Sequence, residues 1–401
     1  MSKYDFERML SPIEPATFFN EYWEKRPLVI SRSQPDYYCE LLSMQDIDSI
    51  IRFTRYKLSG VELVKDGSKV PPGSGQIGNY VNSDGVPDVN KLYNAYCQGY
   101  SFVINGLHER WKPVSVFQRN LEVFLNHPVS INMYMTPKNS RGFAPHFDTH
   151  EVFIVQVEGS KLWRIYDSPI TLPVLSNQKD IPKLTNELSA PVTEICLNAG
   201  DLLYLPRGYI HEACTSESYS IHLTVGVHVF RWSDLITNAI ATLTEQDVRF
   251  RQSLPVGFLQ QDEVKVSLKN QFQELLQLLA DKSEVEDAVE RIAERFLGGM
   301  PPLPDEHFCQ LENIDSLNLD TIVKKREGMI YRVIKKEGQV GIQFAGNSVM
   351  GPQTTERAIR FIADSEEIPI KALPGLTDNA KLTLVRRLIR EGLLVVGSGQ
   401  R

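Results

Sequence analysis

The stretch RGFAPHFDTHEVFIVQVEGSKLWRIYD, residues Arg141 to Asp167, decides the fold that the sequence predicts. Two runs of β-forming residues stand on either side of Gly159. Ahead of the first run, His146 and Asp148 are two positions apart. Because alternate residues of a β-strand point to one face, we expect these two side chains to converge on a β-strand.

The region around this stretch has the pattern of an antiparallel β-fold. From Val129 to about Phe230, short runs such as VSINMYMT, EVFIVQVEG, LLYLPRG and SYSIHLTVGVHVF follow one another, separated by Gly, Pro, Asn and Asp. Such evenly spaced short strands predict an antiparallel barrel or sandwich.

A third residue completes a candidate metal site. His211 follows an apolar strand and a loop in GDLLYLPRGYIHEA, and such a loop can deliver a side chain to the mouth of a barrel. Two histidines and a carboxylate can hold one face of an octahedral metal and leave positions open, as non-heme Fe(II) oxygenases require. The alternative is that His146 and His211 are ordinary loop histidines satisfied by hydrogen bonds.

Three further histidines compete for a role. His150 is four positions after His146, a spacing that also suits one face of a helix, and we expect it to flank the site or face solvent. His222 and His228 share one face of the last barrel strand. Either could support the site, but an ordinary structural role is favoured for both.

Oxygenases of this chemistry commonly bind 2-oxoglutarate, whose far carboxylate needs a cation. Lys161 opens the strand after Gly159 and can point inward together with Trp163, although an exposed surface position is the usual fate of lysine. Asn132 and Tyr134 alternate on the strand before the His-x-Asp segment. Both can hydrogen-bond to the co-substrate, or be polar residues of the core or the strand edge.

Composition limits the other possibilities. The 401 residues predict two or three domains, and the net charge of −7 argues against a general nucleic-acid binder. No apolar run approaches the length of a membrane span, and MSKYDFERML lacks the regions of a signal peptide. The five cysteines are scattered without a CxxC pair, which indicates a reduced, cytoplasmic protein.

The sequence after Trp232 changes to helical periodicity. Helices are predicted at 234–244, 264–279 and 284–296, followed by a linker at 298–306. The helix at 264–279 carries more leucine than one intramolecular face needs, and we therefore expect a homodimer; the leucines are Leu275, Leu276, Leu278 and Leu279. Helices at 354–363 and 378–390 and a final strand give the outline of a winged helix. Its basic residues would suit nucleic-acid binding, but Val385, Leu388 and Ile389 give the last helix a buried face, and we expect a protein-contact or dimer-supporting role instead.

Three segments together resemble a known family. NEYWEKRPLVI, PHFDTHEVFIVQVEGSKLWRIY and GDLLYLPRGYIHEA…SIHLTVG are similar to the JmjC-type ribosomal oxygenases, which are cupin-fold hydroxylases. The resemblance implies an α+β chain with a double-stranded β-helix (cupin/JmjC) barrel in residues 1–231, a helical dimerisation region in 232–305 and a winged-helix-like module in 306–401.

The resemblance also implies roles for single residues. Fe(II) would be held by His146, Asp148 and His211, and 2-oxoglutarate would be bound by Lys161 with contacts from Asn132 and Tyr134. One position departs from the family pattern: Gly226 stands where some relatives have serine near the substrate end of the site. That departure leaves the identity of the substrate open.

The expected function is therefore a 2-oxoglutarate-dependent dioxygenase that hydroxylates a protein side chain, with a ribosomal protein as the expected partner. Two alternatives remain open. One is an oxygenase acting on a small molecule or a biosynthetic peptide. The other is a metal-binding cupin that serves as a scaffold without catalysis, which would be favoured if 2-oxoglutarate failed to bind.

Overall fold

The computed structural model describes residues 4–53, 60–74, 79–82, 86–185, 188, 190–303, 306–336 and 338–397. The chain forms two compact units, Met1–Val229 and Phe230–Arg401. In the part described, no helix is long and apolar enough to cross a membrane.

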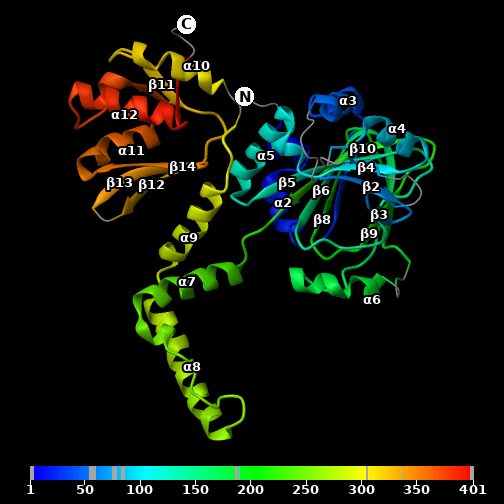
Figure 1. The fold of residues 1–401 in the computed structure, drawn as a ribbon, viewed down its shortest axis with the longest axis horizontal. Helices are drawn as coiled ribbons and strands as arrows, with labels where there is room; N and C mark the ends of the chain where they lie inside the picture. Colours follow the sequence, from blue (N-terminus) through cyan, green and yellow to red (C-terminus); the bar gives the residue numbers. More distant parts are fainter. Residues whose placement is uncertain are drawn as a thin grey trace. The chain divides into compact units, whose positions relative to one another are not determined.

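The first unit is built on antiparallel strands that form the predicted barrel (Figure 1). Its strands are β1 Leu28–Ile30, β2 Val61–Lys65, β3 Ser68–Val70, β4 Ser101–Ile104, β5 Val129–Thr136, β6 Glu151–Ile165, β7 Thr193–Asn198, β8 Leu202–Leu205, β9 His211–Cys214 and β10 Ser220–Val227. They are hydrogen-bonded in the order β1-β8-β6-β10-β5-β4-β2-β3, and β7 and β9 also pair with β6. The antiparallel barrel expected from the sequence is thus the one observed.

Strand β6 belongs to both walls of the barrel. Its first half pairs with β8 and β10, and its second half, from Ser160 to Ile165, pairs with β7 and β9. The change of wall occurs at Gly159, which has a φ of +64° and lies so close to β10 that a Cβ would be 1.9 Å from the Tyr219 carbonyl oxygen. Only glycine can occupy this point, and the residues that follow it are thereby aimed into the barrel.

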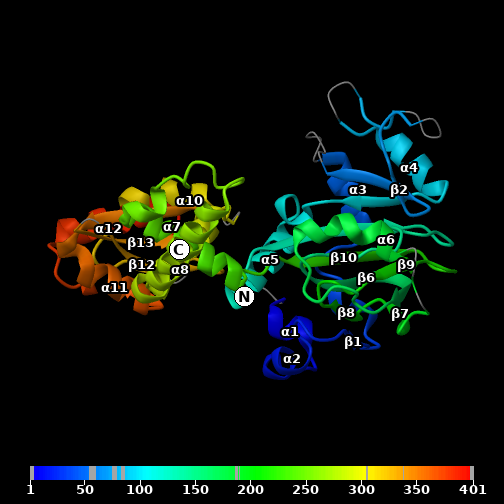
Figure 2. The same ribbon diagram turned by 90° about the horizontal axis from the view of Figure 1, so that it is seen from below.

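Short helices cover the first unit. They are α1 Phe6–Leu10, α2 Pro15–Glu21, α3 Met44–Phe53, α4 Val89–Cys97, α5 Lys112–Leu125 and α6 Ile181–Thr185. Figure 2 shows α1, α2 and β1 on one side of the barrel strands and α3 and α4 on the other. Phe6 and Phe18 from the first two helices pack edge-on against each other and contact Phe153 of β6. The N-terminal segment therefore completes the barrel core.

The second unit begins with three helices and ends with a small α+β module. The three helices at its start are α7 Trp232–Gln246, α8 Asp262–Lys282 and α9 Val285–Gly298. The helices of the module are α10 His307–Glu312, α11 Glu356–Asp364 and α12 Asp378–Arg390. The strands are β11 Ile322–Lys325, β12 Tyr331–Lys336, β13 Gln339–Phe344, β14 Asn347–Pro352, β15 Glu367–Pro369 and β16 Leu394–Val396, in two sheets ordered β15-β11-β16 and β12-β13-β14. The buried face predicted for the last helix is confirmed, because Val385, Leu388 and Ile389 are fully buried.

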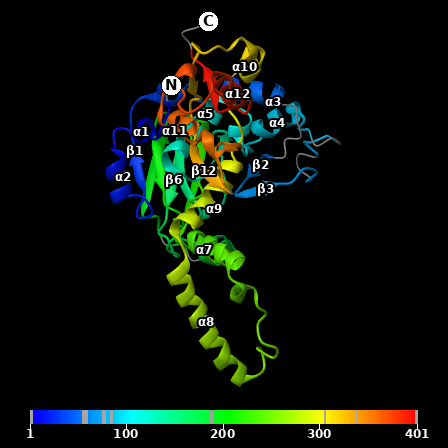
Figure 3. The same ribbon diagram turned by 90° about the vertical axis from the view of Figure 1, so that its left-hand side faces the viewer.

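Helix α8 differs from every other long helix of the described chain in its burial. It extends from α7 and α9 as a long projection (Figure 3), and none of its residues is buried. Phe272 and Leu276 expose 62% and 47% of their surface. The predicted run of leucines is therefore in a helix, and within the described chain Leu276 stays exposed while Leu275, Leu278 and Leu279 are half-buried.

The segment Gly73–Val89, rich in Gly, Asn, Asp and Ser, falls only partly within the described residues. It contains a bridge between Val81 and Pro87 and ends where α4 begins at Val89.

Candidate active site

His146 and Asp148 do not lie on a regular strand. Residues 141–150 form bridges and bends, and β6 begins only at Glu151, so the prediction of a strand here is wrong. The backbone is nevertheless extended at His146, which forms a single antiparallel bridge with His211: each backbone N–H donates to the other residue's carbonyl, at 3.2 and 2.8 Å. A loop segment too short and too bent for a ladder can still alternate its side chains.

That alternation separates polar from apolar side chains. Phe147 packs in an apolar cluster with Tyr166 and Ile210, while His146 and Asp148 line the cavity of the barrel. The backbone N–H of Gly208 donates to the Asp148 carbonyl at 3.0 Å. The Pro-Arg-Gly loop, which the sequence assigned to the delivery of His211, thus also holds the segment that carries Asp148.

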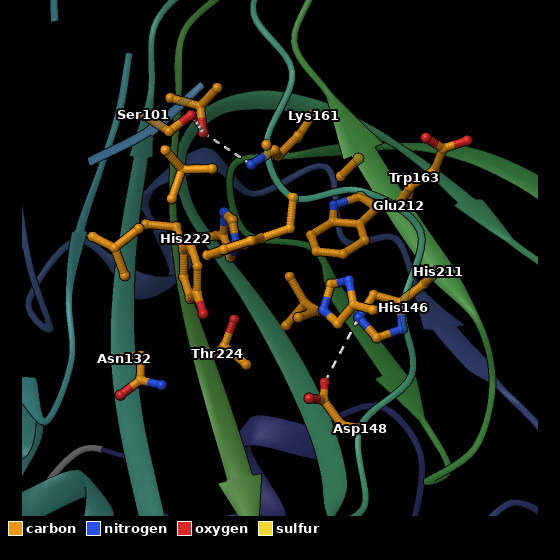
Figure 4. A pocket seen from close by; sticks show the side chains of 18 of the residues that line it. Ser101, Asn132, His146, Asp148, Lys161, Trp163, His211, Glu212, His222 and Thr224 are labelled. Carbon is orange, nitrogen blue, oxygen red and sulfur yellow. Dashed lines mark hydrogen bonds and ion pairs between the residues drawn. The ribbon is translucent and has the colours of Figure 1, made fainter. Parts of the chain in front are cut away.

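His146, Asp148 and His211 come together. One ligand-type atom from each lies within 4.8 Å of the others, and His211 Nε2 is 3.7 Å from Asp148 Oδ2 (Figure 4). In both rings Nδ1 faces a backbone carbonyl, of Ala144 at 2.8 Å and of Tyr209 at 3.0 Å. A carbonyl only accepts, so Nδ1 carries the hydrogen and a neutral ring leaves the Nε2 lone pair free for a metal.

The electrostatics of His211 and Asp148 favour their metal-binding forms. Burial lowers the pKa of His211 to about 4, and the adjacent His146 adds to this effect. Burial alone would raise the pKa of Asp148, but the surrounding histidines, His150 foremost, outweigh it and the net shift is downward. At neutral pH this combination gives a neutral imidazole and a carboxylate, the states from which metals are bound.

Lys161 points into the same cavity from the second half of β6. Its side chain is 3% exposed, and Nζ donates to Thr136 Oγ1 at 2.9 Å. Burial lowers the pKa of Lys161 to about 7. Among the residues that the structure describes, no carboxylate pairs with it. A buried amine without a counter-charge is costly, and an anionic ligand would remove that cost.

Asn132 and Tyr134 also line the cavity, from β5. Asn132 Oδ1 accepts a hydrogen bond from the Gly106 N–H at 2.9 Å, which fixes the orientation of the amide. The Tyr134 ring stacks on His222, with centroids 5.0 Å apart, and burial raises the pKa of its phenol well above the usual value. Both side chains are placed where the sequence expected them, and the phenol stays protonated and able to donate.

The cavity is also lined by residues that the sequence did not assign to the site. His222 was assigned an ordinary structural role, yet it is buried in the cavity wall, and its Nδ1 has no hydrogen-bond partner in the described part of the chain. The same is true of the indole N–H of Trp163. Thr136 lies on the face of β5 that carries Asn132 and Tyr134, so the alternation could have identified it. Ser101 comes from β4, and no local pattern could have placed it there.

Figure 4 shows the resulting arrangement. Lys161 lies at one end of the cavity, the two metal-site histidines lie along one side, and Asp148, Asn132 and Thr224 lie toward the other end. The cavity volume is about 100 Å³. Lys161, the Trp163 N–H that has no partner within the described chain, and the His/Asp/His set in one small space fit a metal together with a small dianion.

Behind the site lies a second group of buried charges. Arg207 Nη1 is 3.0 Å from Glu151 Oε1 and 2.6 Å from Glu24 Oε1, and the Tyr204 hydroxyl donates to Glu151 Oε2 at 2.5 Å. Glu151 is completely buried, and burial raises its pKa to about 7. This network connects the N-terminal segment to both loops that carry the site.

Comparison with known proteins gives concordant results. A family described as JmjC domain matches residues 107–235. The chain is 29% identical to Ribosomal oxygenase 1 of Danio rerio over 441 residues, covering 97% of this chain and 78% of the relative. It is 33% identical to Ribosomal oxygenase 2 of Mus musculus over 290 residues, covering 70% of this chain and 60% of the relative. The structure of YcfD, a ribosomal oxygenase from Escherichia coli, in complex with cobalt and 2-oxoglutarate matches the fold with a TM-score of 0.52 and 15% identity, covering 96% of this chain and 99% of that one.

Proposed function

We propose a specific reaction for a chain that belongs to the JmjC ribosomal oxygenases: it is an Fe(II)- and 2-oxoglutarate-dependent oxygenase that hydroxylates a side chain of a ribosomal protein. Its relatives are named ribosomal oxygenases, and one solved neighbour was crystallised with cobalt and 2-oxoglutarate. The observation that carries the proposal within this chain is the buried Lys161 without a counter-charge, in one cavity with the His/Asp/His set.

In this proposal the residues of the chain divide the work. His146, Asp148 and His211 hold the iron. Lys161 binds the far carboxylate of 2-oxoglutarate, and Asn132 and Tyr134 contact the co-substrate from β5. When bound, iron and 2-oxoglutarate would activate O₂: one oxygen atom would be used to oxidise 2-oxoglutarate to succinate and CO₂, and the other would be inserted into a C–H bond of the substrate.

The protein provides position and shielding. The barrel wall excludes water from the reacting centre, and no general base is required of any side chain. The unpartnered Trp163 N–H and His222 Nδ1 lie in the same cavity wall as Lys161, where they can hydrogen-bond to the bound dianion. A scaffold without catalysis would have no use for a buried amine at this position.

The remaining finer assignments form part of the same proposal. Residues 1–231 are the catalytic domain, 232–305 the dimerisation region and 306–401 the winged-helix-like module. The uncovered apolar side chains of α8 support a homodimer. All five cysteines are free thiols, which suits the reducing conditions of the cytoplasm.

The test is an anaerobic titration of Fe(II)-loaded protein with 2-oxoglutarate, followed by the visible charge-transfer band of the chelate. Wild type should give the band, and Lys161→Ala should weaken co-substrate binding roughly 100-fold, because a buried charge-assisted contact is lost. The matched control is Lys138→Ala, an exposed lysine of the same unit, which should titrate like wild type.

Absence of the band in wild type would overturn the oxygenase proposal. With the band present, incubation with ribosomal proteins and mass spectrometry should find a product 16 Da heavier. Turnover of a free metabolite or precursor peptide, with no change in any ribosomal protein, would favour the small-molecule alternative.

A further inference from the structure

The buried ion pair between Arg207 and Glu151 has no part in the chemistry proposed above. Arg207 is 6% exposed and lies four positions before His211, in the loop that delivers this histidine. Glu151 is the first residue of β6, three positions after Asp148. The contact of 3.0 Å between Arg207 Nη1 and Glu151 Oε1 therefore joins the two segments of the chain that carry the metal-site residues.

The backbone after Arg207 continues this connection into the site. The N–H of Gly208 donates to the Asp148 carbonyl at 3.0 Å, and the Tyr209 carbonyl oxygen is 3.0 Å from His211 Nδ1. Gly208 has a φ of +98°, a conformation that glycine adopts far more readily than other residues. The loop thus contacts the backbone of one metal-site residue and the ring of another, and a displacement of Arg207 would move both.

The same guanidinium reaches the N-terminal segment. Arg207 Nη1 is 2.6 Å from Glu24 Oε1, and the Glu24 backbone N–H donates to the Tyr204 hydroxyl at 2.9 Å. Tyr204 in turn donates to Glu151. Glu24 has a left-handed backbone with a φ of +57°, which costs free energy in a residue other than glycine and persists only where surrounding contacts hold it. The docked N-terminal segment and the buried ion pair therefore support each other.

Stability alone does not account for two buried charges at this point. Burying a charge costs free energy that its partner only partly returns, and well-packed apolar residues often stabilise the same space equally well. The surroundings suit such residues, because the rings of Phe153 and Trp23 pack on Tyr204 with centroids 4.9 and 6.0 Å away. A charge-assisted hydrogen bond adds geometric specificity to this core, since its atoms meet only over a narrow range of distances and angles.

We propose that Arg207 is a positioning residue for the metal site. By contacting Glu151 and Glu24 together, it keeps the segments of Asp148 and His211 at the separation that metal binding needs. It also makes this separation depend on the docked N-terminal segment. Such a coupling is reciprocal, so a metal ion at the site stabilises the docking of the N-terminal segment in return. The inference rests on the proposed function, because it assigns a role at the same metal site.

The first test is a titration of metal-free protein with Co(II), followed by the visible absorption bands of the bound ion. Arg207→Met should bind Co(II) about tenfold more weakly than wild type, the low end of the loss caused by removing outer partners of metal ligands. Arg207→Lys, which keeps a cation, should recover part of that loss. The matched control is Arg119→Met, which takes a second buried arginine of the same unit from an ion pair with Glu122. It should lose stability and still bind Co(II) as wild type does.

The second test measures hydrogen exchange of the backbone amides in the peptide that contains Glu24, with and without saturating Co(II). In wild type the metal should slow this exchange by up to about tenfold, the same factor as the change in affinity. In Arg207→Met the metal should leave the exchange unchanged. A purely structural role would raise exchange equally with and without the metal, and so would not produce this difference.

Equal Co(II) affinities of Arg207→Met and Arg119→Met would overturn the inference, as would a metal effect on exchange that survives in Arg207→Met. If Arg207→Met does not fold, Glu24→Gln takes its place, because Glu24 is 33% exposed and its replacement leaves Arg207 paired with Glu151. Glu24→Gln should weaken Co(II) binding by a smaller factor, and a variant that matches wild type in both tests would overturn the inference. A wild type that binds no Co(II) would overturn the proposed function itself, and so the two failures are distinguishable.

Discussion

The barrel and the helical segment before the C-terminal module depart from the usual burial pattern in opposite directions. The barrel buries charged groups, among them Lys161, Glu151 and Arg207, whereas the helical segment exposes apolar ones, with Trp232 81% and Phe272 62% exposed. Charged residues are rarely buried without a partner, and exposed apolar patches usually mark a contact surface. Each region therefore has side chains that its own fold leaves unsatisfied, and we propose that small ligands complete the barrel and that a second protein surface covers the helices.

The largest effect is expected where the barrel would hold its metal. His146→Ala should lower turnover by more than about 100-fold, exceeding what loss of an outer partner of a metal ligand costs. Thermal unfolding of the metal-free protein should change little, because His146 only half-buries its ring. Turnover is measured by succinate formation, and thermal unfolding is measured by circular dichroism. Retained turnover would remove His146 from the metal, and His127→Ala, a histidine outside the cavity, serves as control.

A contrast within the barrel is the second test. Arg207 is buried between two glutamates, while Arg164 forms a surface ion pair with Glu194 at 2.6 Å. Arg207→Met should lower the free energy of unfolding by about 3 kcal/mol, the low end for a broken buried pair, because Glu151 can take up a proton. Arg164→Met should cost less than about 1 kcal/mol. Equal losses in urea unfolding would contradict the distinction between the two pairs.

The helical side of the comparison is tested by a charge on the exposed face of α8. Leu276→Asp should weaken the dimer by about 2 kcal/mol, which is roughly 30-fold in Kd. The molar mass measured by light scattering at micromolar concentration should then fall from twice the chain mass of 45.6 kDa toward 45.6 kDa. Gln277→Asp, its exposed neighbour, should leave the mass unchanged. A monomeric wild type would remove the dimer from the proposal.

The last test concerns Lys161, whose amine has no carboxylate partner among the described residues. The pKa of Lys161 is about 7 in the folded protein and about 10.4 when unfolded, so between these values the unfolded chain binds more protons. The free energy of unfolding should therefore rise with pH, by up to about 1.4 kcal/mol per unit. Lys161→Met lacks this term, so metal-free variant and wild type should differ most below pH 7 and converge toward pH 10 in urea unfolding. If the stability-versus-pH profiles of wild type and Lys161→Met ran parallel, the lowered pKa of Lys161 would be contradicted. Lys138→Met, which replaces an exposed lysine, should instead give a profile parallel to that of wild type.

Local alternation was enough to find most of the candidate site. It predicted that His146 and Asp148 face one way, that Lys161 points inward with Trp163, and that Asn132 and Tyr134 share a face of β5. It failed where the chain is extended without being a strand, at 141–150, and where distant strands meet. Ser101 reaches the cavity because β4 pairs with β5, and β2 and β3 were not predicted at all. Pairing between distant segments depends on tertiary packing that short patterns do not encode.

His150 illustrates a different limit. Residues four apart on a strand share a face, but residues 149 and 150 are bends and not strand, so the position of the His150 ring in the cavity wall does not follow from strand geometry. The space for that ring is set by Gly226, far along the sequence. The space that the absence of a side chain at Gly226 leaves for the distant His150 ring is visible only in the three-dimensional structure.

The passage of β6 through both walls constrains how this sequence can change over time. Deleting or inserting a single residue between Gly159 and Lys161 would shift the alternation by one, turning Lys161 outward and an adjacent residue inward. A point substitution alters one contact, whereas a one-codon length change here would invert every inward-facing residue as far as Ile165. New specificities in descendants of this protein should therefore arise by exchange of side chains at fixed length in β6, and insertions should accumulate in the connecting loops, where backbone length is free to vary.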